Sequence, residues 1–116
     1  MSDPGEHDER ARRIGENEGL FRNMNEQLKK LAEQFDLDDQ LLLVCECGYP
    51  ECEQRVRVPA EEYERIRSDP RLFVLVPGHE LKDVEEVVAK RGGYSVVKKH
   101  DGTPAQVARE TDPRSD

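Results

Sequence analysis

The sequence of 116 residues contains no tryptophan, and aromatic residues make up only 5% of it. It has no apolar run near the roughly 18 residues that a membrane-spanning helix needs. Its first ten residues, MSDPGEHDER, are polar and lack the apolar segment of a secretory signal peptide. Its three cysteines are too few to close a disulfide framework. These absences argue against membrane proteins and secreted cysteine-rich scaffolds, so we expect a cytoplasmic protein.

The chain also has fewer basic than acidic residues. The chain has 18 Lys and Arg against 26 Asp and Glu, which gives a net charge of −8 at pH 7. That balance argues against binding along a nucleic-acid backbone, where clustered basic side chains neutralise phosphates. The apolar residues gather between residues 40 and 100. A core of about 60 residues buries only about 60% of its unfolded surface, so a bound metal would help to stabilise it.

The N-terminal part predicts one long helix. Residues 1–8 combine several acids with Pro4 and offer no apolar partner, so we expect them to be disordered. Residues 9–36 carry apolar side chains at a heptad-like spacing, which predicts a helix. The positions are Ile14, Phe21, Met24, Leu28, Leu31 and Phe35, with Asn17 filling one gap. The stripe fits three roles: packing on the protein's own core, docking a partner protein, or forming the seam of a homodimer.

Residues 40–100 predict a compact α+β core. Short apolar or alternating runs between Gly and Pro turns are typical of strands. Four strands are expected, at residues 41–44, 53–58, 72–76 and 94–99; the third, five apolar residues in a row, favours a central strand buried on both faces. Two short helices are expected, one from Pro59 to Pro70 and one over residues 81–91, where acids precede bases. We therefore expect an α+β fold with a small, mainly antiparallel sheet of about four strands, two short helices and the longer N-terminal helix.

Charged residues follow this core. Residues 101–116 are acidic, and we expect a mobile tail with at most one helical turn around residues 105–109. Lys98 and Lys99, together with Arg55 and Arg57, suggest either a small basic face or a solvated strand edge, and the strand edge is the simpler interpretation.

The cysteines form a compact motif, C-x-C-x4-C, at Cys45, Cys47 and Cys52. Side chains alternate along a strand, so Cys45 and Cys47 point the same way. A turn at Gly48 to Pro50 can bring Cys52 back beside them. Three thiolates then converge, and zinc requires four ligands in a tetrahedron. The sequence therefore predicts a hairpin pinned by one structural zinc ion, although iron also accepts thiolates.

The fourth ligand has several candidates. We favour His79, because it follows an expected strand and a tight Pro–Gly turn that would hold its side chain. The alternatives are His100, Glu46, Glu51, His7 and water. The cysteines could instead be inert buried residues or a redox pair. Their clustering around a polar turn favours the metal site. Tyr49, at the tip of that turn, could be a recognition residue or a lid over the sulfurs.

The cysteine motif is part of a longer sequence pattern. The motif C-E-C-x4-C is followed by E-Y-E-R-I-R-S-D-P-R-L-F-V-L-V-P-G-H-E, then by V-E-E-V-V and Y-S-V-V-K-K. R-R-I-G-E-N-E-G-L-F-R-N-M-N-E precedes it, and E-T-D-P-R closes the chain. Over most of residues 10–114 the sequence thus resembles a family of small, functionally uncharacterised actinobacterial proteins. The resemblance implies that Cys45, Cys47, Cys52 and His79 form one unit, and it implies no activity or partner.

These observations lead to one expected function and two alternatives. We expect a cytosolic zinc-binding protein that acts as an interaction or regulatory module, with an unidentified protein partner docking on residues 9–36. One alternative is a thiol redox sensor that uses the cysteine cluster. The other is a small metal-dependent enzyme with an open zinc site, where Glu80 or Glu46 acts as general base. Phosphate-binding G-x-x-x-x-G-K-[ST] and hydrolase G-x-S-x-G motifs do not occur.

Overall fold

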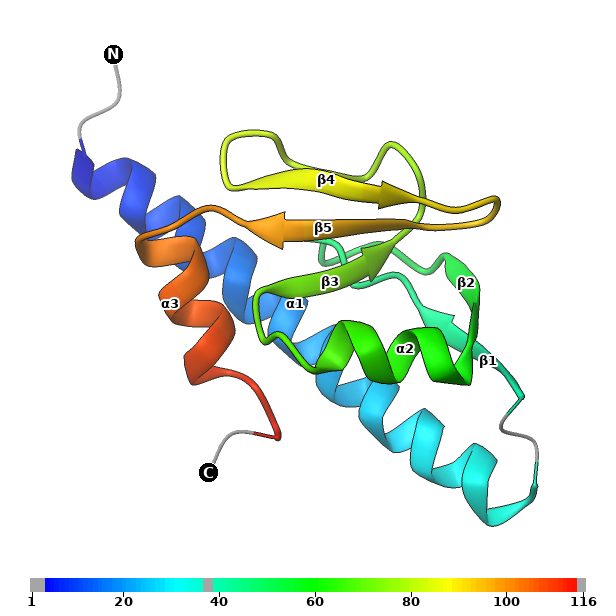
Figure 1. Cartoon of the computed structure of the whole chain (residues 1–116). Helices are drawn as coiled ribbons and strands as arrows, with labels where there is room; N and C mark the ends of the chain where they lie inside the picture. Colours follow the sequence, from blue (N-terminus) through cyan, green and yellow to red (C-terminus); the bar gives the residue numbers. More distant parts are fainter. Residues whose placement is uncertain (1–3, 37–38, 115–116) are drawn as a thin grey trace.

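The computed structural model describes residues 4–36 and 39–114 (Figure 1). It contains three helices and five strands in these ranges. In chain order they are α1 (Pro4–Gln34), β1 (Gln40–Val44), β2 (Arg55–Pro59), α2 (Ala60–Arg67), β3 (Leu72–Leu75), β4 (Glu85–Lys90), β5 (Ser95–Lys99) and α3 (Thr103–Glu110). The expected α+β class, with a long N-terminal helix, two short helices and antiparallel strands, is confirmed. Among the described residues, no helix combines the length and apolar character needed to cross a membrane.

The strands form two small antiparallel sheets rather than one. The first is the hairpin β1–β2, and the second has the strand order β3-β5-β4. In the hairpin, Leu41 pairs with Val58 and Leu43 with Val56, and all four side chains are buried. The central strand of the larger sheet is β5, whereas the apolar run in β3 had suggested that position for β3. The expected burial of β3 on both faces is confirmed, because Phe73, Val74 and Leu75 are all fully buried.

The helix expected over residues 81–91 is wrong. Glu85–Lys90 is strand β4, which pairs with β5 and shifts register between Val87 and Ala89. Val87 pairs with Val97 of β5, and β-branched residues are enriched in strands. The sequence of acids before bases resembled a helix dipole pattern, but pairing with β5 outweighs that weak local preference. The second short helix of the fold is α3 instead.

The chain ends also differ from the expectation. Helix α1 begins at Pro4, so residues 4–8 are helical; residues 1–3, 37–38 and 115–116 lie outside the described residues. Residues 103–110 form α3 rather than a mobile tail, and Ala105, Val107 and Ala108 of this helix are buried. The buried side of α3 consists of small apolar residues, so the acidic composition of residues 101–116 did not indicate a packed helix.

Helix α3 lies beside the N-terminal half of α1 (Figure 1). Two glycines of α1 make the close approach possible. A Cβ on Gly15 would stand 2.7 Å from Cγ1 of Val107, and a Cβ on Gly19 would stand 2.6 Å from Oγ1 of Thr111. Arg22 of α1 extends the contact, because its guanidinium donates to the backbone oxygen of Ala108 (2.6 Å).

The apolar side chains of the α1 stripe differ in their burial. Ile14 is buried in a small cluster with Val84, as expected for packing on the protein's own core. Phe21 and Leu28 are half-buried. The remaining members, Met24, Leu31 and Phe35, are exposed, as is Leu20. The helix therefore has one face in the core and another at the surface.

A buried ionic cluster ties α1 to the larger sheet. The ammonium of Lys99 donates to Oε1 of Glu18 (2.5 Å) and to Oε1 of Glu85 (2.9 Å). All three side chains are fully buried. The expected solvated strand edge is therefore wrong for Lys99, whose partners lie 81 and 14 residues away in sequence.

Candidate metal centre

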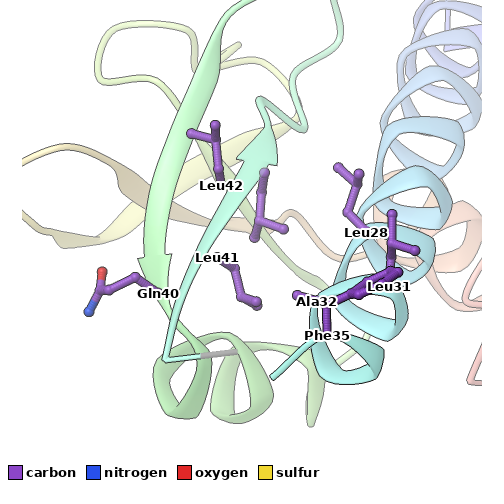
Figure 2. Close-up of a pocket in the computed structure, with 8 residues that line it drawn as sticks. Leu28, Leu31, Ala32, Phe35, Gln40, Leu41 and Leu42 are labelled. Atoms are coloured by element: carbon purple, nitrogen blue, oxygen red, sulfur yellow. The ribbon is translucent and has the colours of Figure 1, made fainter. Parts of the chain in front are cut away.

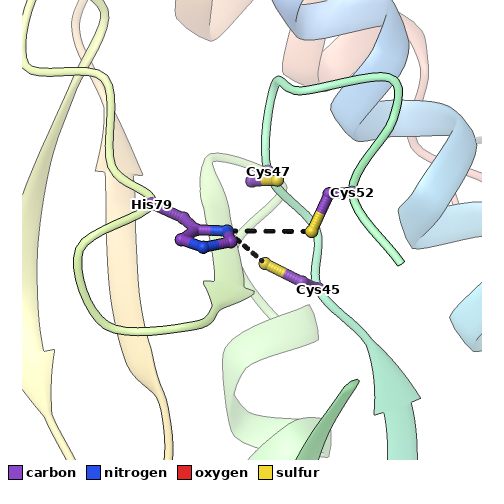
Figure 3. Close-up of side chains that lie close together, drawn as sticks. All are labelled: Cys45, Cys47, Cys52 and His79. Carbon is purple, nitrogen blue, oxygen red and sulfur yellow. Dashed lines mark hydrogen bonds between the residues drawn. The ribbon is translucent and has the colours of Figure 1, made fainter. Parts of the chain in front are cut away.

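The site forms where the two sheets meet. The loop between β1 and β2 carries Cys45, Cys47 and Cys52, and the turn after β3 carries His79. Figure 3 shows the imidazole of His79 directed toward the three cysteine side chains. One potential ligand atom from each of the four residues lies within 4.8 Å of all the others. The structure thus assembles a cluster of three thiols and one imidazole that could hold a metal ion.

Two of the separations among these atoms match a tetrahedral metal site. Nδ1 of His79 lies 3.6 Å from Sγ of Cys45 and 3.7 Å from Sγ of Cys52. Zinc binds sulfur at about 2.3 Å and imidazole nitrogen at about 2.0–2.1 Å, so a tetrahedral angle separates these two ligand atoms by about 3.6 Å. The imidazole therefore already stands at ligand separation from two of the sulfurs.

Backbone hydrogen bonds hold the ligands in place. The peptide N–H of Cys52 donates to Tyr49 O at 3.0 Å, which closes the tight turn of the cysteine loop. The N–H of His79 donates to Val76 O at 3.0 Å and closes the second turn, where Gly78 adopts a φ of 94°. Glycine is the residue that adopts this left-handed conformation most readily.

Each sulfur also accepts a backbone hydrogen bond. The N–H of Val76 donates to Sγ of Cys45 at 3.1 Å. Backbone groups of Tyr49 and Gln54 do the same for Cys47 and Cys52, and each of these bonds lowers the pKa of its thiol. A donor directed at sulfur stabilises the thiolate, which is the form that binds metals.

The thiols differ in their electrostatics. The hydrogen bond from Cys45 lowers the pKa of Cys47 to about 5, although burial acts in the opposite direction. The same hydrogen bond, followed by burial, raises the pKa of Cys45. Burial raises the pKa of Cys52. Of the three thiols, Cys47 therefore has the greatest thiolate character.

Glu46 lies between two cysteines in the segment that follows β1, and its carboxylate bonds groups outside the cluster. Its fully buried carboxylate accepts hydrogen bonds from Nδ2 of Asn25 (2.8 Å), the hydroxyl of Tyr63 (2.9 Å) and the N–H of Val74 (3.0 Å). These three donors occupy the carboxylate, so Glu46 is a structural anchor rather than the fourth ligand. The C-x-C alternation could have revealed this orientation from the sequence.

The other alternative ligands are not part of the cluster among the described residues. His7 lies exposed on α1, Glu51 lies exposed in the cysteine loop, and His100 precedes α3. Two asparagines of α1, which the sequence did not connect with the cysteines, support the site. Nδ2 of Asn17 donates to Cys47 O (3.3 Å), and the amide of Asn25 bonds both the N–H and the C=O of Val44. They join α1 to the cysteine loop.

The site is open on one side. Cys45 and Cys47 are buried, whereas Cys52 and His79 are half-buried. The ring of Tyr49 meets the ring of His79 edge-on, with centroids 6.0 Å apart and planes at 79°. Tyr49 remains 44% exposed, so it supports the outer side of the imidazole without closing the site.

Comparisons of the chain with protein-family models, with curated proteins and with solved structures found no match. The resemblance to the actinobacterial family therefore stays a prediction, and the function has to be argued from the site itself.

Proposed function

We propose that this protein is a cytosolic zinc-binding module, in which Cys45, Cys47, Cys52 and His79 bind one structural zinc ion per chain. The observation that carries the proposal is the convergence of four ligand atoms within 4.8 Å. A three-cysteine, one-histidine ligand set is a common structural zinc site. Thiolates also bind iron, but one imidazole with three thiolates suits zinc well.

The proposed zinc ion would act as a crosslink. Its ligands come from the loop that joins β1 to β2 and from the turn that follows β3, 27 residues beyond Cys52. One ion would therefore fasten the smaller sheet to the larger one. Metal binding of this kind contributes directly to the folding free energy, because the unfolded chain does not hold the ligands together.

The donor set supports a structural role over catalysis. Four protein ligands close the coordination sphere of zinc, whereas a catalytic zinc ion keeps a position for water. Glu46, one of the two residues expected to act as a general base, is fully buried and already bonded to three donors. We therefore favour an interaction or regulatory role for the module, with the exposed face of α1 as its contact surface.

Metal analysis tests this proposal. We expect protein purified without chelator to contain one zinc per chain, with three thiols that react with a thiol reagent only after chelation. His79→Ala should weaken zinc retention. Glu51→Gln is the matched control, because Glu51 lies in the same loop but outside the cluster. Three freely reactive thiols in protein without metal would overturn the proposal.

A second candidate function, thiol redox sensing, is favoured by one observation. Cys47 has a pKa lowered to about 5, and Cys52 is half-buried and therefore reachable from solvent. Peroxides oxidise thiolates that they can reach. Here Cys52 supplies the access and the buried Cys47 supplies the lowered pKa, so the reaction would need both thiols. In this function two thiols would lose two electrons to form a disulfide while one peroxide is reduced to water. Zinc release by dilute peroxide, reversed by a thiol reductant, would support it, and retention of zinc with unmodified cysteines would exclude it.

A further inference from the structure

The outer face of α1 carries an exposed apolar stripe. Leu20, Met24, Leu31 and Phe35 are 59%, 43%, 51% and 65% exposed. With 3.6 residues per turn, these four positions fall within an arc of about 60° on the helix. A single exposed leucine needs no explanation, but a stripe of four on one face of one helix marks an interaction surface.

The middle of this face lacks charge. Between residues 17 and 29 the exposed residues of α1 are Leu20, Asn23, Met24 and Gln27. Charged residues make up 38% of the chain, so their absence from three consecutive exposed turns is unusual. Solvent-exposed helix faces normally carry charged side chains, whereas the centres of protein interfaces are depleted of them.

Two opposite charges border the uncharged stretch. Glu16 lies seven residues before Asn23, and Lys30 lies seven residues after it. Both side chains are exposed and lie on the same flank of the face. No ion pair within residues 4–36 and 39–114 involves either of them. At 1.5 Å per residue, each charge stands about 10 Å from Asn23 along the helix axis.

This pattern is complementary to itself. If two α1 helices pack antiparallel with Asn23 at the two-fold axis, Glu16 of each copy faces Lys30 of the other. Symmetry makes this ion pair twice, once at each end of the uncharged stretch. In the same register, Met24 meets its symmetry mate, and Leu20 of each copy reaches Met24 of the other. A parallel arrangement would bring like charges to the same level instead.

The apolar surface continues beyond this central region. Leu31 and Phe35 border a groove of about 340 Å³ between α1 and β1 (Figure 2). Leu28, Ala32, Leu41 and Leu42 also line it. In the antiparallel register, residues 11–15 of the other copy lie opposite residues 31–35, and the exposed residues among them are Arg12 and Arg13. The N-terminal turns of one α1 therefore lie over the groove of the other copy.

We propose that two copies of this chain associate through the outer faces of their α1 helices, antiparallel and centred on Asn23. The inference deepens the proposed function, on which it rests, by naming the partner of the α1 surface. In this dimer interface, the ion pairs between Glu16 and Lys30 set the register and orientation, and the side chains of Leu20 and Met24 form the apolar centre.

Charge reversal in the full-length, zinc-loaded protein tests the register. Sedimentation velocity over a range of concentrations measures the dimer dissociation constant. Glu16→Lys and Lys30→Glu should each raise it by about tenfold or more, because each change creates two like-charge contacts. The double variant exchanges the two charges and should restore it to within about threefold. Glu53→Lys, an exposed charge reversal outside α1, is the control.

Each outcome is decisive. The proposal is supported if the dimer responds to charge reversal as described and if Met24→Lys dissociates it. A protein that stays monomeric at all concentrations, or a dimer that ignores charge reversal at residues 16 and 30, overturns it. Zinc content is measured in every sample, so loss of the dimer with one zinc retained separates failure of this inference from failure of the zinc site.

Discussion

Nδ1 of His79 lies 3.6 Å from Sγ of Cys45, although 34 residues separate the two in the sequence. The contact bridges the end of strand β1 and the turn that follows strand β3, and these strands belong to different sheets. Three further links run beside it: the N–H of Glu46 bonds Val74 O, the N–H of Val76 bonds Sγ of Cys45, and the carboxylate of Glu46 bonds the N–H of Val74. The candidate metal centre therefore lies at the junction that holds the two sheets together.

The first prediction concerns the origin of stability. Cys47→Ser should lower the melting temperature of zinc-loaded protein strongly, because the serine hydroxyl is a poor zinc ligand. In excess chelator the difference between variant and wild type should become small, since neither then holds zinc. Differential scanning calorimetry with and without chelator measures both values. An equal loss of stability in the two conditions would show that Cys47 acts through packing alone.

The second prediction concerns the buried anchor Glu46. Its two oxygens accept bonds from three donors, so Glu46→Gln places an amide NH₂ against at least one donor. We expect the free energy of unfolding to fall by about 1–3 kcal/mol, the cost of leaving buried polar groups unpaired. Urea denaturation measures the change, with the exposed Glu53→Gln as control. A stability unchanged from wild type would contradict the anchoring role.

The third prediction concerns pH. Glu18 is fully buried beside Glu85 and Lys99, and its Oε2 atom has no hydrogen-bond partner among the described residues. Burial, followed by the negative charge of Glu85, raises the pKa of Glu18 well above its usual 4.5, while Lys99 opposes the shift. A carboxyl group whose pKa is raised by folding stabilises the protein fully below its unfolded pKa, and that stability is lost as the pH rises.

Glu18→Gln should remove this dependence. The glutamine can still accept a hydrogen bond from Lys99, and it cannot ionise. Above about pH 4.5, the unfolding free energy of wild type minus that of the variant should fall as the pH rises. Denaturation of both proteins at matched pH values gives this difference, with Glu9→Gln on the exposed side of α1 as control. A difference that does not change with pH would contradict the assignment.

The fourth prediction concerns the contact between α1 and α3. Alanine normally stabilises a helix over glycine by about 1 kcal/mol. At Gly15 the new Cβ would stand 2.7 Å from Cγ1 of Val107, a fully buried β-branched side chain with little freedom to move. We therefore expect Gly15→Ala to lower the unfolding free energy by about 1–3 kcal/mol, as overpacking does.

Gly92→Ala provides the comparison for this fourth prediction, because a Cβ there meets no atom within 4 Å among the described residues. Thermal denaturation of both variants separates the effect of the clash from the general effect of adding a methyl group. A stabilised Gly15→Ala protein would mean that α3 does not pack against α1 in solution.

Much of the candidate site could be predicted from the sequence because its signals are local. The C-x-C spacing fixes two sulfurs on one side of a strand, and Pro50 marks the turn that returns Cys52. His79 was harder to predict as the fourth ligand, because only its place after a strand and the turn at Pro77 distinguished it from His7 and His100. The same alternation predicts that Glu46 points away from the sulfurs. Because carboxylates also bind zinc, the sequence still left Glu46 among the candidate ligands.

The features that sequence reasoning missed depend on distant partners. Strand β4 forms because β5 offers it a pairing edge, and the local acid-to-base order of residues 83–91 favoured a helix instead. Helix α3 is held by Gly15, Gly19 and Arg22 of α1, none of which is near it in the sequence. Burial of Lys99 requires Glu18 and Glu85 together, and no local pattern brings these three residues into one site.

X-ray absorption spectroscopy at the zinc edge, on the zinc-loaded protein, identifies the ligands of the proposed centre. We expect one zinc per chain with three sulfur ligands at about 2.3 Å and one nitrogen ligand at about 2.0–2.1 Å. His79→Ala should replace that nitrogen signal by an oxygen from solvent, or should abolish zinc binding. A spectrum with no sulfur ligands, or one that His79→Ala leaves unchanged, would contradict the proposed centre.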